Sequence, residues 1–360
     1  MSIQVFLLSI LLIYGTSLGG FGVEGSHRGH KHYHRKNKHH LHSKFGIKKL
    51  FVFGDSYADT GNVPEMWTDK PYGTTFPGKP DGRYSDGHIF TDFVAEYLGL
   101  ESPMPYMLRE YNKKKLHYGM NFAFGGAGAF QTLFPRPNIS TQVGYFEELI
   151  NNELYTTYDL EKSLALVTLS GNDYSAFIAR GGNYADLLVT FIPEVVNELA
   201  RNLKRISKLG VKRIAVGSLP PLGCVPFITK PGGYMKCDEL DNLGSDQHNL
   251  LLTDAVAKLN NESLSTDFGM LNLDSTFLTI FNHSGYPKEN LKLATPYKPC
   301  CEGVGNYSCG DVDKNGKAMY TVCQNPKSAF FWDRVHPTQA GWRSIVAILK
   351  PLLKEISKFS

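Results

Sequence analysis

The chain has 360 residues, of which 42% are hydrophobic, and a formal net charge of +4. Six Lys or Arg against one Glu give residues 1–44 a charge of +5, which leaves −1 for the remainder. A nearly neutral main part argues against a nucleic-acid-binding protein, which would carry a basic stripe with aromatic residues on its folded part. The length fits one α/β enzyme domain with a large core.

The N-terminal segment has the features of a secretory signal peptide. Residues 3–18 form the only long apolar run, and small residues such as Gly19, Gly20 and Gly25 follow it. We therefore expect a signal peptide over residues 1–25. The run is shorter than the ~20 apolar residues of a membrane span, so no stable membrane span is expected. An uncleaved anchor remains the alternative, because no Lys or Arg precedes the run.

A basic, histidine-rich segment follows at residues 26–44, with seven of the twelve histidines and few apolar side chains. Such a composition cannot bury enough apolar surface to fold alone, so we expect a disordered tail. It is either a solvated leader or a segment that binds metal or an acidic polymer in a pH-dependent way. The single folded domain is expected to span residues 45–360.

Cysteines and glycosylation sequons agree with export from the cell. The six cysteines lie at positions 224, 237, 300, 301, 309 and 323. An even count behind a signal peptide predicts disulfides, with their connectivity left open. N-glycosylation sequons begin at Asn138, Asn261, Asn282 and Asn306, and each would be used only on an exposed loop. We expect a secreted, extracellular protein, located in the apoplast or cell wall if the source is a plant.

From residue 48, short apolar runs alternate with longer amphipathic ones, which is the pattern of a parallel sheet covered by helices. The predicted strands are Lys49–Phe53, Tyr118–Ala123, Leu164–Leu169, Val211–Gly217 and Met270–Leu273. The predicted helices include Ile89–Leu98, Thr141–Asn151, Tyr184–Leu209, Asp241–Asn260 and Thr338–Ile356, in which apolar residues recur at steps of three and four.

Polar and glycine-rich motifs follow three of the predicted strands. They are Gly54-Asp55-Ser56, Gly125-Gly126-Ala127-Gly128 and Gly171-Asn172-Asp173. Each motif alone is typical of an ordinary turn. Active-site residues of open parallel sheets, however, gather beyond the carboxyl ends of the strands. A serine, a glycine-rich turn and an Asn side chain at one sheet edge are together the parts of an acyl-transfer site.

Ser56 requires a base, because a free hydroxyl is a weak nucleophile near neutral pH. Asp333 precedes His336 by three residues. That spacing lets the carboxylate reach Nδ1 and leaves Nε2 facing the serine. The sequence thus predicts a Ser56–His336–Asp333 triad, against the alternative of a surface histidine at a helix start.

A developing oxyanion requires donors that are fixed in advance. The candidates are the backbone amides of Ser56 and Gly126 and the side chain of Asn172. Glycine at position 126 lets the backbone approach the substrate without a Cβ, and Gly125 is the fallback. Outside the tail there is no HExxH motif and no closely spaced pair of Cys/His ligands, so no metal is expected.

These motifs resemble those of the plant GDSL esterase/lipases in the SGNH hydrolase superfamily. The four matching blocks are Phe53–Ser56 with Asp59, Gly61 and Asn62, then Gly119–Ala127, Ser170–Asp173 and Asp333–Pro337. The resemblance extends over residues 48–353 and implies a flavodoxin-like three-layer α/β/α sandwich. It implies Ser56 as nucleophile, Asp333 and His336 as its relay, Gly126 and Asn172 in the oxyanion hole, and no metal or organic cofactor. Tyr57 stands where the family name has Leu.

We therefore expect hydrolysis of a small-molecule or lipid ester through an acyl-Ser56 intermediate. Acyl transfer to a sugar, phenolic or polyester acceptor would use the same residues. A non-catalytic wall- or glycan-binding role, motivated by the basic tail, is the third hypothesis. The substrate and the oligomeric state stay open. Five loop aromatics are candidates for an acyl pocket, although such residues more often belong to the core: Trp67, Tyr72, Phe76, Phe130 and Phe134.

Overall fold

The computed structural model describes residues 43–111, 113–282 and 295–358. The predicted signal peptide, and the predicted tail up to residue 42, lie outside the described residues. The framework is a parallel sheet of six strands in the order β2-β3-β1-β4-β5-β6. Without the two-residue edge strand β2, this is the strand order of flavodoxin. The strands are β1 (Lys49–Gly54), β2 (Met104–Pro105), β3 (Gly119–Asn121), β4 (Ser163–Thr168), β5 (Arg213–Gly217) and β6 (Asp267–Leu271).

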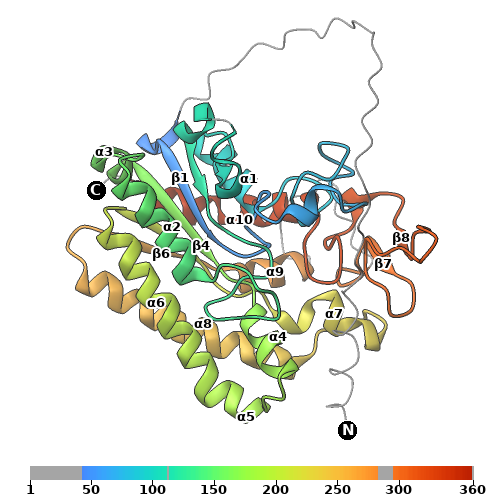
Figure 1. Cartoon of the computed structure of the whole chain (residues 1–360). Coiled ribbons are helices and arrows are strands. Elements are labelled where there is room, and N and C mark those ends of the chain that lie inside the picture. Colours follow the sequence, from blue (N-terminus) through green and yellow to red (C-terminus); the bar gives the residue numbers. More distant parts are fainter. Residues whose placement is uncertain (1–42, 112, 283–294, 359–360) are drawn as a thin grey trace, which may run out of the picture.

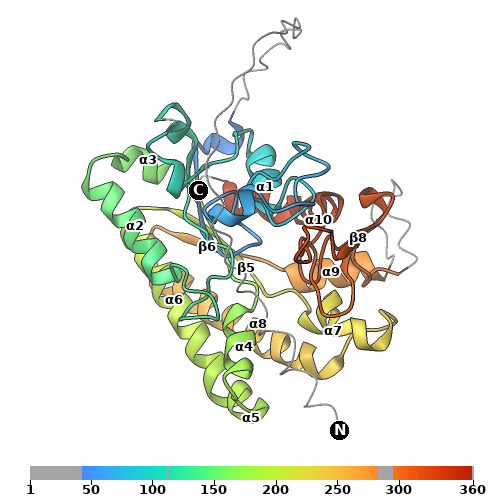
Figure 2. The same ribbon diagram turned by 45° about the vertical axis from the view of Figure 1, so that its right-hand side comes forward.

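Helices cover both faces of the sheet, which makes three layers (Figure 1). Helices α2, α6 and α8 pack on one face, and α1, α9 and α10 on the other, as the turned view in Figure 2 also shows. The helices are α1 (Phe90–Leu98), α2 (Ile139–Asn151), α3 (Thr157–Glu161), α4 (Asn172–Ala179), α5 (Tyr184–Asp186), α6 (Ile192–Lys208), α7 (Pro226–Thr229), α8 (Glu239–Glu262), α9 (Leu273–Phe281) and α10 (Gln339–Ser357).

Each face of the sheet has its own apolar core. Alternate side chains of β1 enter the two cores, because successive residues of a strand point to opposite faces. Phe51 and Phe53 pack against Phe146 of α2. Leu50 and Val52 belong to the cluster that α1 and α10 cover. Strands buried on both faces explain the continuous apolar runs of the sequence.

The predicted α/β fold is confirmed, and two element predictions are corrected. The fifth predicted strand, Met270–Leu273, is placed too late, because β6 begins at Asp267 and Leu273 already begins α9. The predicted helix Tyr184–Leu209 is interrupted by a π-helical segment at Leu187–Phe191. Pro193 near the start of α6 lacks the amide that a regular turn would use there.

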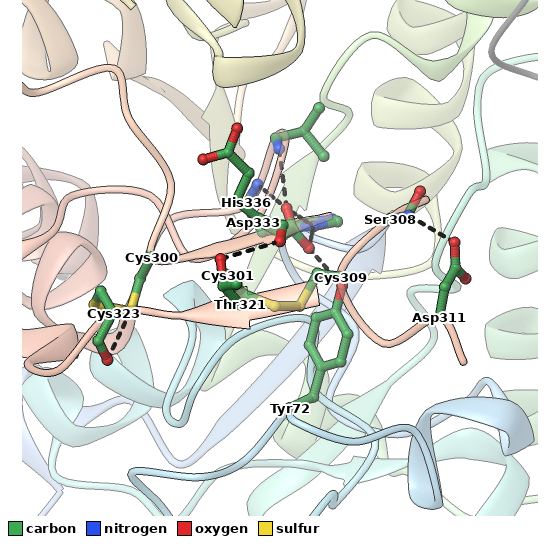
Figure 3. The surroundings of a disulfide bond; sticks show 12 residues. Tyr72, Cys300, Cys301, Ser308, Cys309, Asp311, Thr321, Cys323, Asp333 and His336 are labelled. Carbon is green, nitrogen blue, oxygen red and sulfur yellow. Dashed lines mark hydrogen bonds and ion pairs between the residues drawn. A yellow bond between two sulfur atoms is a disulfide. The ribbon is translucent and has the colours of Figure 1, made fainter. Parts of the chain in front are cut away.

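All six cysteines are paired, as Cys224–Cys237, Cys300–Cys323 and Cys301–Cys309. The last two clamp the small antiparallel sheet of β7 (Cys301–Gly303) and β8 (Tyr320–Val322). Figure 3 shows these two disulfides close to Asp333 and His336. The Cys301 amide donates to the Trp332 carbonyl over 2.6 Å. The disulfide-bonded segment therefore supports the chain directly before Asp333.

Three of the four sequon asparagines, Asn261, Asn282 and Asn306, are exposed. Asn138 is half-buried, and its side chain caps α2 by accepting from the Thr141 amide. Among the helices of the described ranges, none is long and apolar enough to cross a membrane.

Two glycines provide opposite tests of this fold. Gly54 has a φ of +147°, and a Cβ there would lie 2.0 Å from the Thr168 carbonyl oxygen. Gly54→Ala should therefore lower the free energy of unfolding by about 3 kcal/mol. Gly144 lies within α2 with open space around its Cα. Gly144→Ala should raise the free energy of unfolding by about 0.5–1 kcal/mol. Urea denaturation measures both values, and equal effects of the two substitutions would contradict this packing.

Candidate active site

Ser56 lies in the turn that leaves the carboxyl end of β1. The amides of Ala58 and Asp59 bond to the Asp55 carbonyl over 3.0 and 2.9 Å, which closes the turn. Gln142 of α2 holds the strand end itself, because its side chain accepts from the Gly54 amide and donates to the Gly54 carbonyl. Ser56 is 7% exposed. The hydroxyl is thus held in a fixed position that is largely closed to solvent.

The structure brings the three predicted triad residues together. His336 Nε2 lies 2.8 Å from Ser56 Oγ, and Nδ1 lies 2.9 and 2.8 Å from the two carboxylate oxygens of Asp333. Asp333 Oδ1 also accepts the amides of Val335 and His336 over 2.9 and 2.8 Å. Those bonds fold the 333–336 segment into a tight turn, and Thr338 then caps α10. The alternative of a surface histidine is wrong, because His336 is only 9% exposed.

Asp333 carries its negative charge at any ordinary working pH. Burial raises the pKa of this carboxyl, but the charge of His336 and the hydrogen bonds from His336 and Val335 outweigh burial and lower the pKa to about 2. A carboxylate on Nδ1 stabilises the imidazolium that forms when Nε2 accepts a proton. The arrangement can therefore remove the Ser56 proton.

The glycine-rich turn presents Gly126 rather than Gly125 as a free amide. The Gly125 amide donates to Asp59 Oδ2 over 2.9 Å. Across the described residues, neither the Gly126 amide nor the Ser56 amide bonds to another protein group. Gly126 has a φ of +82°, a conformation that favours glycine. Two backbone donors are thus available at the serine, and the fallback to Gly125 is disfavoured.

Asn172 lies at the first residue of α4, beside the same centre, but its amide is already engaged. Its Nδ2 donates to Asp55 Oδ2 over 3.1 Å and to the Ala127 carbonyl over 3.0 Å. A primary amide has two hydrogens, so both have acceptors in this structure. To donate to an oxyanion, Asn172 would have to share one of these bonds or break it.

Two carboxylates next to Ser56 connect the strand ends, a role that the turn motifs did not reveal. Asp55 Oδ2 accepts the amide and the hydroxyl of Ser170 over 2.5 and 2.6 Å. Asp59 accepts the amides of Gly61, Asn62 and Gly125 over 2.8, 2.7 and 2.9 Å. Burial raises the pKa of Asp59 to about 6 despite these hydrogen bonds and the Arg83 charge. In the sequence, the only sign that Asp59 has a role at the site is its place in the motif of Phe53–Ser56 with Asp59, Gly61 and Asn62.

Two buried tyrosines that the sequence did not assign to the centre also contact the Asp333–His336 segment. Tyr72 donates to Asp333 Oδ2 over 2.7 Å, and Tyr57 donates to the Val335 carbonyl over 2.8 Å. Tyr72 is separated from Asp333 by 261 residues, and no local pattern predicts that contact. Tyr57 therefore has a structural partner that the usual Leu could not bind.

The interpretation of the five loop aromatics as core residues holds for Tyr72, which is buried, but it is wrong for three others. Trp67, Phe76 and Phe134 are 41%, 42% and 41% exposed. Phe134 lies against Gly126, because a Cβ on that glycine would come within 2.6 Å of the Phe134 ring. Phe130 is half-buried and packs near Phe191. Phe134 is therefore an apolar surface next to the free amide.

The site contains no arrangement of side chains suited to a metal. Within the described part of the chain, no group of three or more His, Cys, Asp or Glu side chains is arranged to hold an ion.

Comparison with known proteins identifies the family. Residues 50–348 match the family model of the GDSL-like lipases and acylhydrolases. The chain belongs to this family. It is 46% identical to the GDSL esterase/lipase At5g03610 of Arabidopsis thaliana, over 97% of this chain and 96% of that protein. It is 43% identical to At3g09930 of the same plant, over 97% and 98%.

Both relatives are named GDSL esterase/lipases, a family of carboxylic ester hydrolases, and the resemblance in the sequence motifs is thereby confirmed. Among solved structures, an α/β hydrolase enzyme from the metagenome of Lake Arreo aligns with a TM-score of 0.40 and 13% identity, over 85% of this chain and 96% of that one. That similarity is too low to add to the assignment. The chain is thus a hydrolase of the GDSL esterase/lipase family.

The low pKa of Asp333 predicts a specific loss of stability in acid. The pKa of this carboxyl is about 2 in the folded protein, so the unfolded chain takes up the proton first as the pH falls. The stabilisation is complete above the ordinary aspartate pKa and is lost between about pH 4 and about pH 2, by about 2 kcal/mol. The Asp333→Asn variant lacks this contribution.

Urea denaturation of wild type and of Asp333→Asn from about pH 5 to about pH 2.5 measures how much the charged Asp333 carboxylate stabilises the fold. The difference in unfolding free energy between the two proteins should shrink as the pH falls. A difference that stays constant over this range would show that Asp333 is not held as a charged group by its neighbours.

Proposed function

We propose that this GDSL hydrolase is a secreted serine esterase or lipase that cleaves carboxylic esters through an acyl-Ser56 intermediate. The observation that carries the proposal is the 2.8 Å contact between Ser56 Oγ and His336 Nε2, with Asp333 bonded to Nδ1 of the same ring. A serine hydrolase has this arrangement, in which a nucleophile bonds to a base and the base bonds to a carboxylate that orients it.

In the first step, Ser56 Oγ attacks the carbonyl carbon of the ester while His336 Nε2 accepts its proton. The carbonyl oxygen becomes an oxyanion, which accepts hydrogen bonds from the Ser56 and Gly126 amides. Those donors are fixed before the reaction, so they stabilise the developing charge without reorganisation. Among residues 43–111, 113–282 and 295–358, neither amide has a competing protein partner, which supports this assignment.

Asn172 is the proposed third donor to the oxyanion. Its Nδ2 group is 3.0 Å from the Ala127 carbonyl and 3.1 Å from Asp55. A full negative charge competes well against a neutral carbonyl for the same hydrogen, because hydrogen bonds to ions are stronger. We therefore expect the bond to Ala127 to weaken when the tetrahedral intermediate forms.

In the second step, the protonated His336 gives its proton to the oxygen of the leaving alcohol, and the tetrahedral intermediate collapses to acyl-Ser56. A water molecule then attacks the acyl carbon while His336 again takes a proton. Return of that proton to Ser56 Oγ releases the carboxylic acid. Asp333 stays ionised throughout, because its pKa of about 2 lies far below the working pH.

The proposed substrate is a small-molecule or lipid ester. The ring of Phe134, which is 41% exposed and lies against Gly126, supports an apolar contact with part of it. Secretion is supported by three disulfides, which persist in oxidising compartments, and by exposed sequons at Asn261, Asn282 and Asn306. Acyl transfer uses the same steps with an alcohol in place of water, and adding candidate acceptors to the assay distinguishes the two.

Replacing the nucleophile tests the mechanism. Ser56→Ala should lower kcat for short and long p-nitrophenyl esters by roughly 10⁴-fold or more, because no other hydroxyl in the described part of the chain bonds to His336 Nε2. Wild type should also gain the mass of a fluorophosphonate probe on the peptide that contains Ser56. The control is Ser275→Ala, an exposed serine of α9, which should keep wild-type rates. Hydrolysis by Ser56→Ala at the wild-type rate would overturn the proposal.

A second substitution tests the third donor. Asn172→Ala should lower kcat by about 10²–10³-fold with little change in KM, because the amide stabilises the transition state more than the bound ester. Thermal unfolding of the variant separates this effect from damage to α4. An unchanged kcat in a folded variant would mean that the two backbone amides form the whole oxyanion hole.

A further inference from the structure

Tyr72 is a buried phenol whose hydroxyl bonds to the carboxylate oxygen that also faces His336 Nδ1. Its hydroxyl donates to Asp333 Oδ2 over 2.7 Å. Figure 3 shows the ring reaching Asp333 next to His336. Of the described residues, only Tyr72 and His336 contact this carboxylate through a hydrogen-bonding side chain.

The phenol and the imidazole compete for the same oxygen. Asp333 Oδ1 accepts two backbone amides, from Val335 and His336, and lies 2.9 Å from His336 Nδ1. Oδ2 receives the Tyr72 hydroxyl at 2.7 Å and His336 Nδ1 at 2.8 Å. A strong donor on Oδ2 withdraws part of the negative charge that would otherwise act on the imidazolium. The contact therefore affects how tightly Asp333 holds a protonated His336.

We propose that Tyr72 is a positioning residue of the catalytic relay, which fixes the Asp333 carboxylate and limits its hold on the protonated His336. The inference rests on the esterase mechanism proposed above. Tyr72 touches no reacting atom and acts only through Asp333. By weakening the hold of Asp333 on the imidazolium, Tyr72 keeps His336 able to give its proton to the leaving alcohol. An imidazolium that is held too tightly is a poor acid.

The phenol remains a donor at every working pH. Burial and the negative charge of Asp333 raise the pKa of Tyr72 well above its ordinary value. The ring is also seated independently of its hydroxyl. The backbone amide of Tyr72 donates to the Asp69 carbonyl over 3.2 Å. The Tyr72 ring packs edge-on against Trp332, with the two ring centroids 6.1 Å apart. Removing the hydroxyl should therefore leave the ring in place.

Other charged and aromatic groups face the same centre. Asp55 interacts electrostatically with His336, and Asp69 interacts with both Asp333 and Tyr72. The rings of Tyr57 and Tyr84 lie 6.0 and 5.2 Å from the His336 ring. All of these groups are unchanged by a substitution at Tyr72. A shift in pH dependence between wild type and a Tyr72 variant therefore reports on the Tyr72 hydroxyl.

The test compares Tyr72→Phe with Tyr57→Phe as a matched control. Both substitutions delete one buried phenol hydroxyl that bonds to the 333–336 segment, but Tyr57 donates to the Val335 carbonyl and not to the carboxylate. The measurement is kcat/KM for a short p-nitrophenyl ester from about pH 4 to about pH 9, together with thermal unfolding midpoints.

For Tyr72→Phe, the acid limb of the profile should move to higher pH by about half a unit to one unit, since Asp333 then holds the imidazolium more tightly. The plateau should fall by about 3–10-fold. For Tyr57→Phe, the acid limb should stay at its wild-type position. A loss in Tyr72→Phe that is the same at every pH, or an equal shift in both variants, would overturn the proposal.

Proton NMR of the wild-type protein provides a reading that requires neither a substitution nor ester turnover. The Tyr72 hydroxyl proton should show a nuclear Overhauser effect to the His336 Nδ1 proton, because both protons bond to Asp333 Oδ2. The absence of this effect, with the Nδ1 proton observed, would overturn the proposal. Failure of the esterase mechanism would instead show in Ser56→Ala and leave this signal intact.

Discussion

Two buried carboxylates, Asp55 and Asp59, hold the catalytic centre together. Parallel pairing brings the carboxyl ends of β3, β1 and β4 side by side, about 4.8 Å apart, but strand pairing does not connect the loops that follow these ends. Asp55 binds Ser170 and Asn172 after β4, and Asp59 binds Gly125 after β3. These contacts hold the Gly126 backbone and the Asn172 side chain, the proposed oxyanion donors, around Ser56. Fixed donors matter because electrostatic catalysis depends on dipoles that require no reorganisation.

The buried carboxylates around Ser56 differ in how their charge is compensated. Burial raises the pKa of Asp55, and it raises the pKa of Asp59 and of Asp173 to about 6, because backbone and hydroxyl donors only partly replace water. Asp333 is equally buried, but the charge of His336 and several hydrogen bonds bring its pKa down to about 2. The first group therefore anchors the loops after the strands, whereas Asp333 forms hydrogen bonds with the His336 ring. Removing water from a site strengthens such a pairing and makes any unpaired charge costly.

The sheet and the positions of Ser56 and His336 were predictable from the sequence, because each depends on a local pattern. Fully buried strands are read as continuous apolar runs, and Ser56 and His336 stand in short motifs at strand and helix ends. Contacts that join distant segments left no such pattern, so Tyr72 and the engaged amide of Asn172 were missed. The predicted start of β6 was three residues too late because Asp267 and Gly269 interrupt the apolar run of this strand. The exposure of three loop aromatics, Trp67, Phe76 and Phe134, depends on how the loops run over the surface. The spacing of apolar residues, which predicts helices and strands, says nothing about the course of a loop.

The proposed roles of Ser56 and Gly126 can be tested by a crystal structure of the protein after reaction with a fluorophosphonate, because the adduct imitates the tetrahedral intermediate. We expect phosphorus bonded to Ser56 Oγ and the phosphonyl oxygen within hydrogen-bonding distance of the Ser56 and Gly126 amides, with the Gly125 amide still bonded to Asp59. A probe on another residue, or a phosphonyl oxygen that faces away from Gly126, would contradict it.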